Sequence, residues 1–273
     1  MRSNKHFLFG AMGFAGGAAG AVAGEIVPEF ASSPVLLVLH VTIWSAVCAA
    51  LITVGLFAAG EIYNRRPLSS AILRKALIGG AIAGAVAGAI AQAVYSVQPA
   101  PSLFKHVILR LFCWGLMGAI LGWRLAAVVP NLGMTRGVTA GALGGAVGGI
   151  GFLVAGSVIP QAFGRMFGLG ILGATLGLAI VWAEAFFREA SIEITWAPKE
   201  TTSVTLGPHP VYIGGGDDHV YVAGLPEHAA ELVHENGKIQ YIESAIGKRT
   251  DLRDGSKLKI GNIEVLVRAK RQV

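Results

Sequence analysis

The chain contains little charge and almost no cysteine. Charged residues make up 14% of its 273 residues, and only two cysteines, Cys48 and Cys113, are present. Both lie inside long apolar segments and lack the spacing of metal ligands or of a disulfide framework, so we expect them to pack as small apolar side chains. No nucleophile–base–acid set and no cluster of metal ligands is recognisable. The sequence therefore predicts a protein that is not an enzyme and needs neither cofactor nor metal.

The chain is rich in long apolar segments. Hydrophobic residues account for 53% of it, and the mean hydropathy is +0.62. A bilayer crossing needs about 20 apolar residues. Segments of that length lie at about 7–27, 35–60, 72–95, 105–128, 135–157 and 165–187. We therefore predict a polytopic α-helical membrane domain with six spans.

The apolar segments contain an internal repeat. The sequence RLFCWGLMGAILG from Arg110 returns as RMFGLGILGATLG from Arg165, and more faintly as HVTIWSAVCAALI from His40. Each copy follows a proline, at Pro28, Pro99 or Pro160. Such a repeat predicts three related helical hairpins.

Positive charge is unevenly distributed between the loops. Residues before about 190 include twelve Lys/Arg and five Asp/Glu, and those after it ten and eleven. Nine of the twelve cations fall on the side that carries both termini, and three fall on the other side. The positive-inside rule then predicts an integral protein, for which we expect the bacterial inner membrane, with both termini cytoplasmic. This loop pattern also explains the net charge of +6 without a nucleic-acid partner.

The N-terminus admits a second interpretation. Arg2 and Lys5 precede an apolar run that ends in Ala21-Val22-Ala23, a pattern that also fits a cleaved signal peptide. We favour retention of residues 1–23, because the same glycine and alanine spacing recurs in the third and fifth spans. Cleavage would also leave five spans and break the pairing of the hairpins.

Glycines recur at every fourth residue of the odd-numbered spans. A stripe without side chains lets helix backbones approach closely, which is a main source of helix association in lipid. We expect these glycines to build a tight bundle or a contact between copies of the chain; a further reading is that the three glycine-rich helices surround a narrow conduit. The clearest stripes are Gly80, Gly84 and Gly88, and Gly137, Gly141, Gly145 and Gly149.

Three basic residues occupy equivalent positions of the repeat, namely His40, Arg110 and Arg165. One interpretation is a ring of residues whose long side chains reach the membrane surface. The alternative is an electropositive vestibule for an anion. Few other ionisable groups lie within the spans, and those near the span ends, such as Glu61 and Glu184, are expected to reach the headgroups.

From residue 190 onward the hydrophobic pattern changes to a period of two. Short alternating segments such as SIEITW, KIQYIE and IEVLVR are separated by Gly, Pro, Asp and Asn. This pattern is typical of a small antiparallel sandwich. We therefore predict two domains, a membrane domain over 1–189 and an all-β sandwich over 190–273.

The β segment resembles a forkhead-associated (FHA) domain over about residues 203–269. The resemblance rests on Ile213-Gly214, His228-Ala229, Asp254-Gly255 and Ile260-Gly261 in the expected order. It implies an eleven-stranded sandwich that binds phosphothreonine peptides through its apical loops.

The side chains that hold phosphate in that family are replaced here. Gly215, Leu225 and Ile246 stand where the resemblance places the arginine, the serine and the asparagine. None of the three supplies a charge-assisted donor from its side chain, so we expect recognition that does not depend on phosphate. The loop residues that remain candidates for protein interaction are Asp217, Asp218, His228, Ser244, Lys248 and Arg249.

Two functions follow from these features. The first is a membrane anchor or assembly subunit whose cytosolic FHA-like domain binds a protein partner without phosphate. The second is a channel or transporter, formed by the repeated hairpins and gated by the FHA-like domain. The first is favoured, because a protein-binding domain is visible in the sequence and a substrate site is not.

Overall fold

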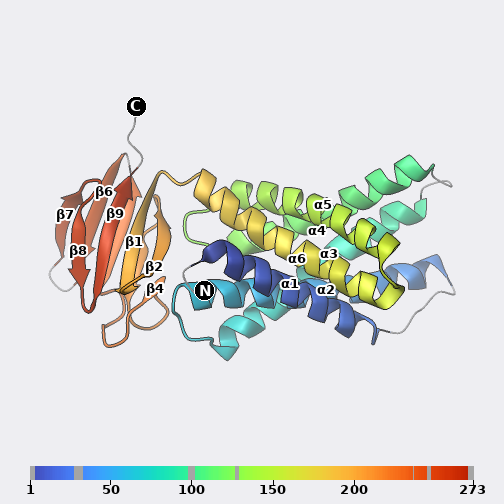
Figure 1. Ribbon diagram of the computed structural model, residues 1–273, viewed down its shortest axis with the longest axis horizontal. Helices are drawn as coiled ribbons and strands as arrows, with labels where there is room; N and C mark the ends of the chain where they lie inside the picture. Colours follow the sequence, from blue (N-terminus) through green and yellow to red (C-terminus); the bar gives the residue numbers. More distant parts are fainter. Residues whose placement is uncertain are drawn as a thin grey trace.

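The computed structural model describes residues 4–27, 33–97, 102–126, 129–235, 237–244 and 247–269. A bundle of long helices is followed by a β domain at one of its ends (Figure 1). Pro28, Pro99 and Ile246 lie outside the described residues. The predicted fold class, a six-span helical membrane domain followed by a β sandwich, is confirmed.

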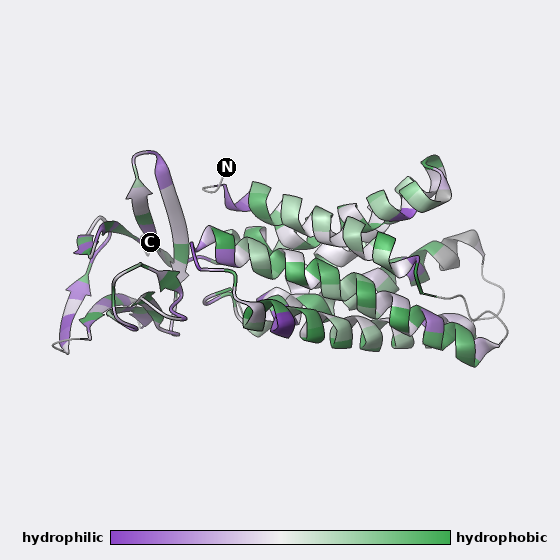
Figure 2. Cartoon of the chain, turned by 90° about the horizontal axis from the view of Figure 1, so that it is seen from below, coloured by the Kyte–Doolittle hydropathy of each residue, from purple (hydrophilic) through white to green (hydrophobic). Residues whose placement is uncertain are grey.

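Within the described part of the chain, six helices are long and apolar enough to cross a membrane. Figure 2 shows hydrophobic residues along their whole length. The helices are α1 Lys5–Gly24, α2 Pro34–Tyr63, α3 Ser70–Val97, α4 Leu103–Ala126, α5 Met134–Val158 and α6 Gln161–Phe186.

Local sequence explains where the first two helices begin. The side chain of Asn4 accepts a hydrogen bond from the backbone N–H of Phe7 at 3.0 Å, and that of Ser33 from Leu36 at 3.2 Å. Pro34, which has no N–H to satisfy, occupies the first position of α2. These caps satisfy donors that the first helical turn leaves free.

The helices form a ring in which α6 closes on α1. Helices α2, α4 and α6 contact one another, whereas α1, α3 and α5 pack chiefly in the grooves between two of them. Buried side chains of the three central helices, including Ile52, Leu121 and Leu176, join one apolar cluster. The glycine-rich helices are therefore peripheral, and the expectation that they surround a conduit is wrong.

The β domain consists of two sheets in the described residues, ordered β2-β1-β9-β8 and β4-β3-β5-β6-β7. All pairs are antiparallel except β3 with β4. The strands are β1 Ala190–Ala197, β2 Glu200–Leu206, β3 Val211–Gly214, β4 Val220–Tyr221, β5 Ala230–Glu235, β6 Lys238–Glu243, β7 Lys248–Leu252, β8 Lys257–Ile260 and β9 Ile263–Ala269. The described part thus has nine strands, where the FHA resemblance implies eleven.

Alternation along the strands builds the core of this domain. In β9, Ile263, Val265 and Val267 are buried while Glu264 is exposed, and Ile192 and Ile194 of β1 are fully buried. Because side chains alternate between the two faces of a strand, the side chains on one face of each sheet pack into the core. The apolar core of the β domain is separate from that of the helices.

Candidate functional site: the surfaces of the β domain

Strand β2 lies against the end of the helical bundle. The hydroxyl of Tyr63, at the end of α2, accepts a hydrogen bond from the backbone N–H of Ser203 at 2.7 Å and lies 3.4 Å from the carbonyl oxygen of the same residue. The Arg188 guanidinium donates to the Ser203 hydroxyl at 2.9 Å. One edge of the first sheet is therefore covered by the membrane domain, which protects it from pairing with another strand.

Two buried glutamates strengthen this junction. Glu184 of α6 is 3% exposed; it accepts a hydrogen bond from the Thr205 hydroxyl at 2.9 Å and forms an ion pair with Lys5 of α1. Glu61 of α2 is fully buried and pairs with Arg66. The expectation that both carboxylates reach the headgroups is wrong, because folded protein encloses both, and β2 contributes to the surroundings of Glu184 through Thr205. Truncating one partner of such a buried pair is costly.

A third contact comes from the turn between α4 and α5. The Asn131 side-chain amide donates to the carbonyl oxygens of Thr205 and His209, at 3.3 and 3.1 Å, and accepts from the His209 N–H at 3.1 Å. The β domain is thus held by residues from α2 and α6, by Arg188 just after α6, and by the α4–α5 turn.

The loop after β3 faces the segment that joins α2 to α3. The Arg66 guanidinium donates to the carbonyl oxygen of Asp218 at 3.5 Å, and Arg65 pairs with Glu200 while lying over the Trp196 ring. A cavity of about 430 Å³ separates this segment from Tyr221 and its neighbours. The loop after β3, to which the FHA resemblance would assign peptide binding, therefore lies partly against the membrane domain.

Asp218 and His228, both predicted loop residues, are brought together. The Asp218 side chain is fully buried; it accepts a hydrogen bond from the His228 N–H at 2.7 Å and contacts Nδ1 of the same histidine. His228 has a φ of +52° and stacks on Tyr212, with ring centroids 4.2 Å apart. The pair fastens the loop after β4 to the loop after β3.

His219 also stacks on Tyr212. Its ring lies 5.7 Å from that of Tyr212, and its Nδ1 accepts a hydrogen bond from the Tyr212 N–H at 3.1 Å. Burial lowers the pKa of His219, and the nearby Arg66 acts in the same direction. The neutral ring, which can accept that hydrogen bond, is the form that the fold favours.

Two of the three positions that the resemblance assigns to phosphate, Gly215 and Leu225, are used for packing. A Cβ atom at Gly215 would lie within 3.0 Å of the Leu225 carbonyl oxygen, so a larger residue does not fit there. Leu225 itself packs against the core of the β domain. Ser244 and Asp217 are exposed, and the Ser244 N–H donates to the Ala229 carbonyl oxygen at 3.3 Å.

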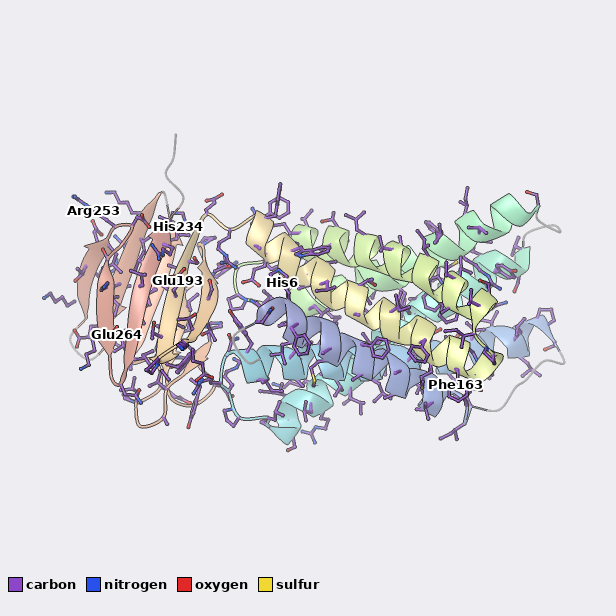
Figure 3. The ribbon with its side chains drawn as sticks, viewed as in Figure 1. His6, Phe163, Glu193, His234, Arg253 and Glu264 are labelled. Atoms are coloured by element: carbon purple, nitrogen blue, oxygen red, sulfur yellow. The ribbon has the colours of Figure 1, made fainter. Side chains whose placement is uncertain are left out.

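The edges of both sheets that lie farthest from the bundle carry exposed cations. Strands β7 and β8 form these edges (Figure 1), and Arg253 lies between them, on the side away from His6 at the near end of the bundle (Figure 3). We call this surface the distal edge. No ion pair within the described residues involves its exposed cations, which are Lys248, Arg249, Arg253, Lys257 and Lys259.

The glycine stripes lie at contacts between helices of the same chain. A Cβ atom at Gly80 or Gly84 of α3 would come within 3.0 Å of the α2 backbone, and one at Gly88 within 3.0 Å of the Ser45 side chain on α2. In α5, such an atom at Gly137, Gly141 or Gly145 would come equally close to α4, and at Gly149 to the Trp114 ring of α4. These contacts give the stripes a role inside one molecule.

The three basic repeat positions have different surroundings. Arg165 pairs with Glu25 at 2.7 Å, Arg110 is exposed beside a cleft between α3 and α4, and His40 is half-buried in α2. All three lie in the half of the bundle away from the β domain.

Sequence reasoning missed the residues of the junction, chiefly Tyr63, Arg66 and Asn131. The sequence feature that could have indicated this junction is the presence of an acidic residue near the end of two apolar spans, Glu61 and Glu184. Comparisons with known proteins add no identity, because no protein family, no curated protein and no solved structure matches the chain.

Proposed function

We propose that the protein is a membrane anchor that presents its β domain to an acidic protein partner at the distal edge. The observation that carries the proposal is the asymmetry of the β domain. The β2 edge is covered by the bundle through Tyr63 and Arg188, whereas β7 and β8 remain open. An open strand edge supplies unpaired backbone groups to an added strand.

Charge indicates the kind of partner. Five exposed cations lie along β7, β8 and the turn between them, while Asp251 and Asp254 of the same segment accept hydrogen bonds from Gln240 and the Ala269 N–H within the domain. An acidic extended segment would gain both backbone hydrogen bonds and charge complementarity there. Binding by this route needs no phosphate, consistent with the packing at Gly215 and Leu225.

The orientation belongs to the same proposal. The excess of Lys and Arg in the loops beside the β domain supports a cytoplasmic β domain in a bacterial inner membrane. In intact cells, an impermeant maleimide should label Ser157→Cys and leave Thr250→Cys unlabelled. Labelling of both, or of Thr250→Cys alone, would contradict this orientation.

Photo-crosslinking in cells tests the partner surface. A photoreactive amino acid at Thr250 of β7 should form one discrete adduct with an acidic protein, and the same probe at the exposed Thr201 of β2 should not. The adduct should disappear in Lys248→Glu/Arg249→Glu and persist in a charge reversal of Lys199, outside the distal edge. No adduct at Thr250, or an adduct indifferent to the charge reversal, refutes the proposal.

Phosphate dependence is tested on any captured partner segment. The full chain in nanodiscs should bind the segment with the same affinity before and after threonine phosphorylation. A charge-assisted hydrogen bond contributes about 1.5–3 kcal/mol, so an intact phosphate pocket would give a preference of roughly tenfold or more. A preference of that size would replace this proposal with phosphorylation-dependent recognition.

A further inference from the structure

The bundle contains an apolar cleft lined by α2, α3, α4 and one residue of α5, in the half away from the β domain. Its volume is about 290 Å³, and its walls include Trp44, Gly88, Trp114 and Phe152. Neither the FHA resemblance nor the proposed partner binding uses this cleft.

Glycine packing explains why the cleft opens between α3 and α4. Gly84 draws α3 against the α2 backbone, and Gly118 draws α4 against the α5 backbone. Helices α3 and α4 consequently contact each other less than the other sequence neighbours do. The gap lies inside the second of the three helical hairpins that the repeat predicts.

Polarity changes along the length of the cleft. Gln92 and Arg110 lie near the end of α3 and the start of α4, at the mouth of the cleft, while Met117 lies about two turns further along α4. Helix α4 begins at Leu103, so Arg110 lies about two turns into it, in the half of the bundle away from the β domain. An arginine at that depth reaches the level of the lipid phosphates.

Arg110 also lacks a counter-charge. It forms no ion pair with a described residue, whereas Arg165, at the equivalent repeat position, is neutralised by Glu25. The cleft thus combines an apolar interior with one uncompensated cation at its mouth.

We propose that this cleft binds one acyl chain of an anionic phospholipid, whose phosphate contacts Arg110. The walls offer too few polar groups to hold water along the whole cleft. An acyl chain from the surrounding leaflet restores the dispersion contacts that an empty cleft lacks. The cation at the mouth selects the negative headgroup, and Gln92 supplies a neutral hydrogen-bonding group beside it.

Tryptophan quenching in vesicles tests the site with the full chain. Trp123, Trp182 and Trp196 are replaced by Phe, so that emission comes from Trp44 and Trp114 in the cleft walls. Lipids with brominated acyl chains are titrated into phosphatidylcholine vesicles. Brominated phosphatidylglycerol should reach half-maximal quenching at a several-fold lower mole fraction than brominated phosphatidylcholine.

Matched variants separate the headgroup contact from the acyl site. Arg110→Gln should abolish the preference for phosphatidylglycerol, and Arg165→Gln should retain it. Ala91→Phe, which narrows the cleft, should weaken quenching by both lipids. The proposal is overturned if the two lipids quench equally in the protein that carries only the three Trp→Phe substitutions, or if the preference survives Arg110→Gln. Loss of the preference when inorganic phosphate is added also overturns it, because the site would then bind a free anion.

Discussion

Removing the hydroxyl of Tyr63 should loosen the junction between the bundle and the β domain. In Tyr63→Phe, the Ser203 N–H loses its acceptor at 2.7 Å, and the ring still fills its place. The second contact of the hydroxyl, at 3.4 Å to the Ser203 carbonyl oxygen, is long and adds little.

The expected cost follows from these two contacts. A partly buried donor left without an acceptor costs about 1–3 kcal/mol, and the half-buried position of Ser203 favours the lower part of that range. A cost of about 1–2 kcal/mol raises the population of the opened junction by a factor of about 5–30. Hydrogen exchange of the β2 amides in nanodiscs should accelerate by that factor, with the effect centred on Ser203.

Tyr241→Phe provides the matched control. Tyr241 lies in β6 of the same domain, and its hydroxyl has no hydrogen-bond partner among the described residues. Its removal should leave β2 exchange unchanged. If Tyr63→Phe changes β2 exchange by less than twofold, or if the two variants behave alike, the reasoning about the junction is refuted.

Two further predictions concern packing and pH. Gly84→Leu and Gly141→Leu place a side chain where even a Cβ atom meets backbone within 3.0 Å, so each should lower the stability in detergent by about 1–3 kcal/mol or more. Gly156→Leu is the control and should be tolerated, because a Cβ atom there has no neighbour within 4 Å. Equal melting temperatures for all three variants would contradict the assigned contacts. The pKa of His219 is lowered in the folded protein, so at low pH the unfolded chain binds a proton at this histidine more readily than the folded chain does. The contribution of His219 to the stability is therefore complete above about pH 6.5 and falls as the pH drops below that value. The variant His219→Asn keeps an acceptor for the Tyr212 N–H but does not titrate. Denaturant unfolding should therefore show a smaller loss of stability between pH 7 and pH 5.5 in this variant than in the unsubstituted protein. An identical loss in the two proteins would exclude His219 as a cause.

The amino-acid pattern predicts the elements well because each depends on local periodicity. The six spans and the change to alternating strands near residue 190 are both present, with α6 ending at Phe186 and β1 beginning at Ala190. The recurrence of glycine at every fourth residue, as around Gly84 and around Gly141, indicates close contact between helices, because the backbones can approach only where side chains are missing. It does not indicate which helix is the neighbour, and so the peripheral position of α3 and α5 was not predicted.

The junction was not predictable in the same way. Glu61 and Glu184 stand near the ends of apolar spans, where a carboxylate ordinarily reaches water or headgroups. The surroundings of Glu184 include Thr205 of a second domain and Lys5 of the distant helix α1. Glu61 pairs with Arg66, which follows it in sequence but reaches back to it only because the chain turns after α2. Local sequence does not contain that three-dimensional arrangement.

The central claim is that the β domain is fixed on the bundle with its distal edge directed away from it. Pulsed electron paramagnetic resonance between spin labels at His6→Cys and Thr250→Cys, in nanodiscs and with Cys48 and Cys113 replaced by alanine, measures this directly. Both labelled positions are exposed. We predict one narrow distance distribution that broadens in Tyr63→Phe/Glu184→Gln. A broad distribution in the background without these two substitutions would show a freely tethered domain and contradict the account.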